Sequence, residues 1–326
     1  MNLYPLKFKT IYKDKIWGGN KVKTILNKDF SPLPNCGETW EISGVQGDIS
    51  VVENGLLANN NLQELIEVYM GELVGDHIFD KFGIEFPLLI KFIDANDDLS
   101  IQVHPNDELA KERHNAYGKT EMWYVIDAEK GSKLNCGFFK KITKKEYFKH
   151  LEENTLTSIL NYEKVNPGDV FFIPAGRVHA IGKGILLAEI QQTSDVTYRI
   201  YDYNRPGTNG KPRELHTELA ADAIDYEYYD EYKTNYSNEF NKTSSIIQCE
   251  YFNTNILEFN TIIEKDYGYI DSFIIYICLE GTFTIIDDNK NKTEINKGET
   301  VLLPAVLNNI ALIPKIKSKI LEVYIK

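Results

Sequence analysis

The stretch VNPGDVFFIPAGRVH (residues 165–179) is echoed by INKGETVLLPAVLNN (residues 295–309), 130 residues further along the chain. Each copy runs from an apolar residue through a turn glycine, an acid and a short apolar strand to a Pro-Ala pair. A looser echo pairs WYVIDAEKG (123–131) with IYICLEG (275–281). Such self-similarity is typical of repeated structural units, so we predict two copies of one β unit.

The two copies differ at a residue type that commonly binds metals. Asn309 of the second copy stands where His179 stands in the first, and no histidine follows His216. Imidazole is a frequent metal ligand, so any histidine metal site is expected in the first copy.

The texture of the chain between these repeats is mostly β. Short segments rich in β-branched and aromatic residues include FPLLIKFI (86–93), EMWYVID (121–127) and GILLAEI (184–190). Turn residues bound most of them, as in Asn-Asp-Asp at 96–98 and Asn-Pro-Gly-Asp at 166–169. Many short strands with regular turn signals predict a sandwich or a barrel.

A few helices interrupt this pattern. Helical spacing of apolar residues predicts helices in 60–82, 143–160 and 213–226. Thr143 stands three residues before Glu146, which is a capping-box pattern. The polar segment 227–245 is interpreted as a linker, so we expect an N-terminal domain at 1–235 and a C-terminal β domain at 246–326.

Composition limits the classes of function. The net charge is −12, from 36 basic and 48 acidic residues, which disfavours nucleic-acid binding. The longest apolar run, Phe273–Leu279, is far shorter than the ~20 residues of a membrane helix. The N-terminus lacks a secretory apolar region, and the four cysteines form no CxxC pair. A reduced, cytoplasmic protein that binds neither membranes nor nucleic acid is therefore expected.

The positive charge is uneven along the chain. Six lysines crowd the first 23 residues, namely Lys7, Lys9, Lys13, Lys15, Lys21 and Lys23. They form either a solvated lysine face or a positive patch beside a site for an anionic small molecule, and the sequence leaves both interpretations open.

Polar residues with metal-binding side chains lie in three strand-like contexts. In LSIQVHPND (99–107), alternation places Ser100, Gln102 and His104 on one strand face. Glu121 opens EMWYVID, and His179 follows a Pro-Ala-Gly turn. Imidazole and carboxylate groups suit zinc and also iron, nickel or manganese. Spacing alone does not separate such a site from two hydrogen-bonded histidines in a β core.

Four motifs, in order, resemble one family. LSIQVHPND, GKTEMWYVI, GDVFFIPAGRVHAIG and EIQQTSDVTYRIYDYNR are similar to motifs of the type I mannose-6-phosphate isomerases, in their short bacterial form. KIWGG (15–19) and ETWEISG (38–44) fit the same family. The resemblance implies a mostly β fold of two cupin-type jelly-roll barrels, or double-stranded β-helices, with a few helices. The N-terminal domain would be catalytic and the C-terminal one metal-free.

The resemblance also implies a cofactor, one Zn²⁺ per chain, and its ligands. Matched position by position, these ligands are Gln102, His104, Glu121 and His179. The remaining histidines, His77, His114, His150 and His216, are expected to be structural.

Catalytic roles follow from the same resemblance. Arg199 matches an arginine assigned to catalysis, and Lys119 matches a lysine proposed to act near the substrate. Ser100 and Glu189 are expected to contact the substrate. Glu189 and Asp195 remain alternative bases, and Glu189 could instead be a hydrogen-bond partner inside the barrel.

The arginines of the fourth motif have a simpler alternative. Arg199 and Arg205 could pair with Asp202, although Arg205 also lies where a phosphate or sugar contact is plausible.

The activity implied is interconversion of mannose 6-phosphate and fructose 6-phosphate through an enediol. The expected partner is a phosphosugar, bound by a monomer or weak homodimer. A cupin oxygenase and a non-catalytic metal- or sugar-binding cupin are the alternatives. Oxygenase sites often carry two closely spaced histidines, whereas Gln102 and His104 form the corresponding pair here.

Overall fold

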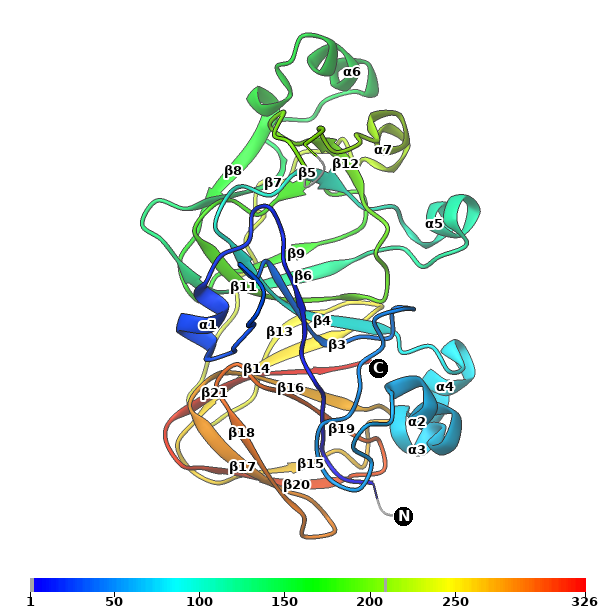
Figure 1. The fold of residues 1–326 in the computed structure, drawn as a ribbon, viewed down its shortest axis with the longest axis vertical. Coiled ribbons are helices and arrows are strands. Elements are labelled where there is room, and N and C mark those ends of the chain that lie inside the picture. Colours follow the sequence, from blue (N-terminus) through cyan, green and yellow to red (C-terminus); the bar gives the residue numbers. More distant parts are fainter. Residues whose placement is uncertain (1–2, 208–209) are drawn as a thin grey trace.

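Two pairs of β-sheets are stacked in four layers in the computed structural model, which describes residues 3–207 and 210–326 (Figure 1). The N-terminal pair has a six-stranded inner sheet and a five-stranded outer sheet. In order, the inner sheet contains β2 (Ile11–Lys13), β3 (Glu38–Ile42), β4 (Leu88–Ala95), β11 (Ile185–Gln192), β6 (Glu121–Ala128) and β9 (Val170–Ile173). The outer sheet contains β12 (Tyr198–Tyr201), β5 (Ile101–Val103), β10 (His179–Ala180), β7 (Lys133–Phe138) and β8 (Leu160–Lys164).

The C-terminal pair repeats this plan. Its six-stranded sheet contains β1 (Leu6–Lys7), β19 (Thr300–Leu303), β16 (Ile274–Glu280), β21 (Ser318–Tyr324), β14 (Asn253–Phe259) and β13 (Ser244–Gln248). Its four-stranded sheet contains β15 (Ile263–Asp266), β20 (Asn309–Pro314), β17 (Thr282–Ile286) and β18 (Lys292–Asn296). The order β4-β11-β6-β9 recurs as β14-β21-β16-β19, and β5-β10-β7-β8 recurs as β15-β20-β17-β18. The prediction of a mostly β chain is confirmed. Each sheet is open at its edges, so the described strands form no closed barrel.

Three apolar layers hold the four sheets together. Phe92 and Ile190 of one six-stranded sheet and Ile275 and Val323 of the other belong to a single buried cluster. Separate clusters fill the space inside the N-terminal and C-terminal pairs. Strand β11 is therefore buried on both faces, and alternation turns Glu189 away from the side of Ala188 and Ile190.

The ends of the expected N-terminal domain are tied to other parts of the molecule. Strand β1 pairs with β19 of the C-terminal sheet, with Leu6 opposite Leu302. The segment interpreted as a linker is irregular but packed: Tyr232 is buried in the N-terminal core, and the Tyr236 hydroxyl donates to the Gly168 carbonyl at 2.7 Å. The tyrosines of this otherwise polar segment supply the apolar surface that packs it against the N-terminal sheets.

The helix expected at 60–82 is three short helices. These are α2 (Leu62–Tyr69), α3 (Gly71–Val74) and α4 (Asp76–Phe82). The chain breaks at Met70, with φ 46°, and at Gly75, with φ 101°. A Cβ at position 75 would lie 2.4 Å from the Asp271 carbonyl oxygen, so close approach to the second sheet pair also requires the glycine.

The other predicted helices begin or end differently from the pattern. Helix α6 (Lys144–Glu152) carries the predicted capping box of Thr143 and Glu146, and a 3₁₀ turn at Leu156–Ile159 follows it. Helix α7 (Thr217–Ala223) is shorter than the predicted 213–226. Residues before it run beside β12, where the His216 N–H donates to the Arg199 carbonyl at 2.7 Å.

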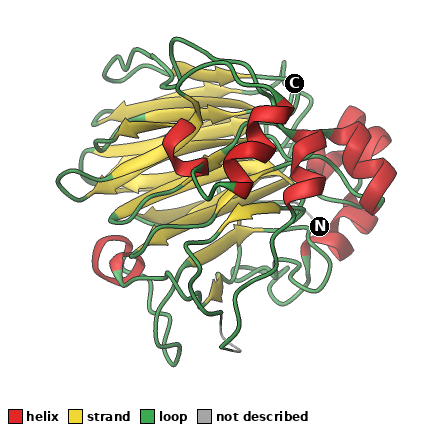
Figure 2. Ribbon diagram, turned by 90° about the horizontal axis from the view of Figure 1, so that it is seen from above, coloured by secondary structure: helices red, strands yellow, loops and turns green. Residues whose placement is uncertain are grey.

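The remaining helices are α1 (Lys21–Leu26) and α5 (Asp107–His114). All helices lie outside the sheets, chiefly toward one side (Figure 2). Among the described residues, no helix is long and apolar enough to cross a membrane.

Candidate metal centre and active site

Three buried side chains from three strands meet between the N-terminal sheets. His104 follows β5, Glu121 opens β6 and His179 opens β10. One ligand atom from each lies within 4.8 Å of the others. The His104 Nε2 is 3.5 Å from Glu121 Oε2, and the His179 Nε2 is 3.4 Å from Glu121 Oε1. The sheets thus bring together three of the residues that the sequence predicted as ligands.

Backbone carbonyls orient both imidazoles. The His104 Nδ1 lies 3.0 Å from the Val196 carbonyl, and the His179 Nδ1 lies 2.8 Å from the Arg177 carbonyl. A carbonyl can only accept, so each Nδ1 carries the proton and each Nε2 presents a lone pair to Glu121. This second hydrogen bond is typical of metal-binding histidines.

Most of the facing atoms accept no hydrogen bond from the described residues, although Lys119 Nζ lies 3.3 Å from Glu121 Oε2. Within the described part of the chain, His104 Nε2 and both Glu121 oxygens are buried without a hydrogen bond. Burying unpaired acceptors is costly, and a cation placed among them would satisfy all three. Two nitrogen donors and a carboxylate suit a borderline divalent metal.

Gln102 lies at the edge of this cluster. Its amide nitrogen is 3.2 Å from His179 Nε2. Amide orientation follows from the hydrogen-bonding network, and a half-turn of this amide would point its oxygen to the same place. Gln102 could therefore add a fourth donor.

Burial keeps both imidazoles neutral. It lowers the pKa of His179 to about 4 and holds the pKa of His104 well below its ordinary value. Burial, followed by the neighbouring Glu189 carboxylate, raises the pKa of Glu121 to about 7. Neutral imidazole is the form that binds metals.

A cavity of about 240 Å³ adjoins the cluster. Five of the residues predicted for the site line it: Ser100, Gln102, Lys119, Glu189 and Arg199. Lys119 connects the cavity to the cluster, since its Nζ is 3.3 Å from Glu121 Oε2 and the residue is 5% exposed. Asp195, considered as an alternative base, also lines this cavity.

Glu189 is held by two neighbours that lie beside it in the sheet. The Trp123 Nε1–H donates to Glu189 Oε2 at 2.9 Å, and Lys91 Nζ is 3.2 Å from Glu189 Oε1. Burial would raise the pKa of Glu189, but Lys91 and Lys119 outweigh it and leave the pKa lowered. Glu189 is therefore a fixed, ionised acceptor on the cavity wall.

Sequence reasoning missed several lining residues. Lys91, Trp17, Glu38, Trp40 and Arg213 also line the cavity. Lys91 had a signal, because it is the one charged residue inside FPLLIKFI. Trp17, Glu38 and Trp40 belong to KIWGG and ETWEISG. These motifs fit the family resemblance, but the resemblance assigned no function to their residues. Nothing in the sequence indicated that Arg213 lines the cavity, because the pattern predicted it as the first residue of a helix at 213–226.

The N-terminal lysines are mostly paired at the surface. Lys7 pairs with Glu299 at 2.6 Å and Lys21 with Asp127 at 2.7 Å. Of the six lysines, Lys15 lines the cavity, at 3.3 Å from Glu38. Of the two interpretations, the paired surface lysines fit the solvated face, and Lys15 is the member of the group that lies beside the candidate site.

The remaining histidines have partners elsewhere. His114 Nε2 lies 2.7 Å from the Tyr198 hydroxyl, and His77 Nδ1 lies 3.0 Å from Asp271. His150 Nδ1 lies 2.8 Å from the Thr155 hydroxyl, and His216 Nδ1 accepts from the Arg199 N–H at 3.1 Å. These contacts agree with the structural roles expected for them.

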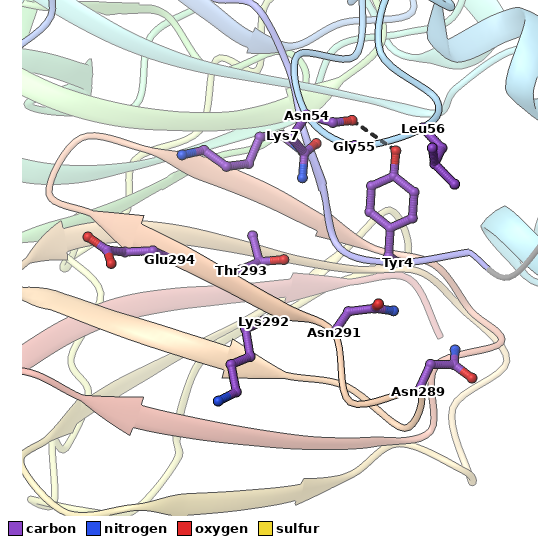
Figure 3. Close-up of a pocket in the computed structure, with 10 residues that line it drawn as sticks. All are labelled: Tyr4, Lys7, Asn54, Gly55, Leu56, Asn289, Asn291, Lys292, Thr293 and Glu294. Carbon is purple, nitrogen blue, oxygen red and sulfur yellow. Dashed lines mark hydrogen bonds between the residues drawn. The ribbon is translucent and has the colours of Figure 1, made fainter.

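A larger hollow of about 800 Å³ lies elsewhere, between the N-terminal segment and the turn that joins β17 to β18 (Figure 3). Tyr4 on its wall donates to the Asn54 carbonyl at 2.8 Å. None of the predicted site residues line this hollow. The chemistry of the smaller cavity, rather than size, marks the candidate active site.

A buried His-Glu-His cluster that could hold a metal ion lies beside a cavity with lysine, arginine and carboxylate side chains, between stacked β-sheets. This combination is typical of a metal-dependent enzyme with a mostly β fold. Comparison with known proteins agrees. The model of the type I phosphomannose isomerase catalytic domain matches residues 5–135.

Known relatives match from about two thirds of the chain to nearly all of it. It is 37% identical over 319 residues to the mannose-6-phosphate isomerase ManA of Bacillus subtilis, covering 96% of each chain. It is 40% identical over 220 residues to the mannose-6-phosphate isomerase of Streptococcus mutans, covering 68% of this chain and 67% of the relative. The crystal structure of the mannose 6-phosphate isomerase from Bacillus subtilis superposes with a TM-score of 0.88 at 32% identity, over 99% of both chains. The chain belongs to the type I phosphomannose isomerase family.

Proposed function

We propose that this protein interconverts mannose 6-phosphate and fructose 6-phosphate at the cavity beside the His104–Glu121–His179 cluster. The observation that carries the proposal is this cluster of ligand atoms, of which His104 Nε2 and both Glu121 oxygens make no hydrogen bond among the described residues. It lies beside a cavity lined by Lys119, Glu189 and Arg199. The names of the relatives agree with that activity.

We propose Zn²⁺ as the metal, held by His104, Glu121, His179 and the Gln102 oxygen. Its donor set, two imidazoles and a carboxylate with a weak amide ligand, supports this choice. A bound zinc ion would act as a Lewis acid that polarises a substrate oxygen.

The side chains of the cavity would perform the proton transfer between C1 and C2. Lys119 lies at the cavity wall and would move the proton. Glu189, which is ionised and held in place by Trp123 and Lys91, would accept a hydrogen bond from a hydroxyl group of the sugar. Arg199, whose Nε is buried without a hydrogen bond among the described residues, would stabilise the negative charge that develops on the enediolate oxygen. Ser100, which directly precedes β5 and lines the same cavity, would contact the sugar.

We also propose the cupin assignment and the division of labour between the two domains. The repeated strand order supports duplication of one jelly-roll unit. Asn309 in place of His179 supports a metal-free C-terminal domain at 246–326 and a catalytic domain at 1–235. A cytoplasmic location remains a prediction. A monomer or weak homodimer is also a prediction, and size-exclusion chromatography with light scattering would test it.

A coupled assay tests the function. Fructose 6-phosphate formation from mannose 6-phosphate is followed before chelation, after chelation and after zinc add-back, with metal content measured at each step. We expect turnover that falls with chelation and returns with zinc. No turnover in protein of verified zinc content would overturn the proposal and favour an oxygenase or a binding protein.

A further inference from the structure

The two cationic residues of the proposed reaction are held in different ways. Arg199 lies within strand β12. Asp202, which the sequence suggested as a partner for it, pairs instead with Arg205 at 2.8 Å and with Arg213 at 2.7 Å. Lys119 lies outside the strands, in the connection of residues 115–120 between α5 and β6. The position of its amino group therefore depends on what holds this connection in place.

The first residue of α5 lies against this connection. The Lys119 N–H donates to the Pro105 carbonyl at 3.1 Å, and the Gly118 N–H donates to Asp107 Oδ1 at 2.8 Å. A Cβ at position 118 would lie 2.5 Å from the Asp107 nitrogen, so this close approach requires a glycine. The Asp107 side chain therefore holds the residue that directly precedes the lysine.

The same carboxylate oxygen also holds the residue that follows the lysine, through Gln192 at the end of β11. Gln192 Nε2 donates to Asp107 Oδ1 at 3.1 Å, and Gln192 Oε1 accepts from the Thr120 N–H at 2.8 Å. Both partners require this orientation of the amide, because a carboxylate only accepts and a backbone N–H only donates. Lys119 is thus held on both sides by contacts that meet at one aspartate.

The second oxygen of Asp107 is held by the C-terminal sheet pair. Tyr251, in the turn between β13 and β14, donates its hydroxyl to Asp107 Oδ2 at 2.9 Å. Burial, followed by this hydrogen bond, raises the pKa of Tyr251, so the hydroxyl keeps the proton that it donates. Asp107 therefore connects the C-terminal pair to both neighbours of Lys119 in the chain.

We propose that Asp107 is a positioning residue that places Lys119 for proton transfer, and that Tyr251 extends this role to the C-terminal sheet pair. This inference rests on the proposed function. A group that moves a proton must lie within hydrogen-bond reach of the substrate, and a displacement of about 1 Å can lower the rate about 100-fold. Contacts at residues 118 and 120 restrict the backbone from which the lysine side chain extends.

The experiment compares Asp107→Ala, Asp107→Asn and Tyr251→Phe with two matched controls. Asp288→Ala also removes the acceptor of two backbone N–H groups, at 2.8 and 2.9 Å, but within the C-terminal pair. Tyr236→Phe also removes one hydroxyl hydrogen bond, at 2.7 Å. Neither control residue is among the described residues that line the cavity beside the metal cluster.

The inference predicts a loss of turnover without a loss of metal. We expect Asp107→Ala to lower kcat about 10- to 100-fold, with a smaller change in KM and unchanged zinc content. Asp107→Asn should recover most of this loss, because its amide oxygen still accepts from the Gly118 N–H. Tyr251→Phe should lower kcat about 3- to 10-fold, because the two contacts of Asp107 Oδ1 remain.

A double variant tests whether Tyr251 acts through Asp107. Adding Tyr251→Phe to Asp107→Ala should lower kcat no further, because the acceptor of the hydroxyl is already absent. Both controls should keep the kcat of the wild type. A wild-type kcat in Asp107→Ala, or an equal loss in Asp107→Asn, would overturn the inference while the proposed function stands.

Hydrogen exchange followed by mass spectrometry separates the two proposals, since it needs no turnover. In the zinc-loaded protein we expect residues 115–120 to exchange at least 10-fold faster in Asp107→Ala than in the wild type, with an intermediate rate in Tyr251→Phe. Strands β4 and β11 should keep their protection, and both controls should match the wild type. Equal protection of residues 115–120 in the wild type and Asp107→Ala would overturn the inference whatever the isomerase assay shows.

Discussion

Two hydrogen bonds to backbone carbonyls decide what His104 and His179 can do. Each hydrogen bond fixes the ring proton on Nδ1, so that the lone pair of Nε2 points toward Glu121. The strands that carry these residues are far apart in sequence, but His179 pairs in register with Gln102. The donor set is therefore rigid, because every ligand is held by the sheet or by a carbonyl.

Loss of either imidazole should remove the metal. Removing a residue that only hydrogen-bonds to a ligand typically lowers metal affinity about 10- to 100-fold. We expect His104→Ala and His179→Ala to lower it further, because each removes a ligand itself. Metal content after dialysis and isomerase activity are the measurements. His150→Ala, whose ring contacts Thr155 at the surface, is the control. Full activity in metal-free ligand variants would contradict the assignment.

Arg199 should act on turnover rather than on the metal. Arg199→Lys keeps a positive charge but loses the planar fork and the buried Nε. We expect kcat to fall about 10²- to 10³-fold, with zinc content and thermal stability unchanged. Steady-state kinetics with metal analysis provide the test, and a kcat near that of the wild type would remove Arg199 from the mechanism.

At the scale of elements, one short helix, α1, is capped by a side chain from a strand. Helix α1 has no side-chain cap from its own N-cap residue, Asn20. Asp94 of β4 accepts instead from the Lys21 and Val22 N–H groups, so a strand caps the helix. Its position explains why sequence near the helix carried no cap signal.

The pH dependence of stability follows from this cap. Burial raises the pKa of Asp94 from 3.8 to about 6. The folded protein thus holds this proton more tightly than the unfolded chain, and the contribution of Asp94 to stability falls as pH rises from about 4 to about 6.

The variant Asp94→Asn isolates this pH-dependent contribution to stability, because the amide does not titrate. The free energy of unfolding of the variant relative to the wild type should increase by about 2 to 3 kcal/mol between pH 4 and pH 6. Urea unfolding at several pH values measures it. A difference that does not change with pH, or that changes in the opposite sense, would contradict the prediction.

The whole molecule is joined by one shared apolar layer between its two six-stranded sheets. The layer includes residues of both sheet pairs, and β1 crosses from the N-terminal segment into the C-terminal sheet. In the C-terminal pair, Glu322, 3% exposed, bonds to Lys265 at 2.6 Å and Asn255 at 2.9 Å. Two units that share so much buried surface should unfold together.

Calorimetry tests this coupling. We expect one thermal transition for the zinc-loaded protein, and Lys265→Met should lower that same transition by destabilising the fold by about 3 to 5 kcal/mol. Zinc binding and KM should not change, because Lys265 lies in the other sheet pair. Two separate transitions, with the variant shifting one of them, would show independent domains.

Much of the fold was predictable because its signals are local. Alternation and turn residues indicated a mostly β chain, and Thr143 with Glu146 indicated the start of α6. Repeated motifs indicated duplication, and the strand order repeats accordingly. The residues His104, Glu121 and His179 were identified as ligands through the family resemblance of their motifs, because their spacing alone left two hydrogen-bonded histidines in a β core as an alternative.

The sequence by itself determined which units form and which donors are available, since periodicity and capping involve residues a few positions apart. Tertiary structure alone decided that 60–82 divides at Met70 and Gly75, and that Arg213 leaves its expected helix to face the cavity. It also decided that Lys91 forms an ion pair with the ionised Glu189 across paired strands. Lys91 with Glu189 and Gly75 with Asp271 are contacts between residues far apart in the sequence, so they arise when the sheets assemble and not from any local pattern.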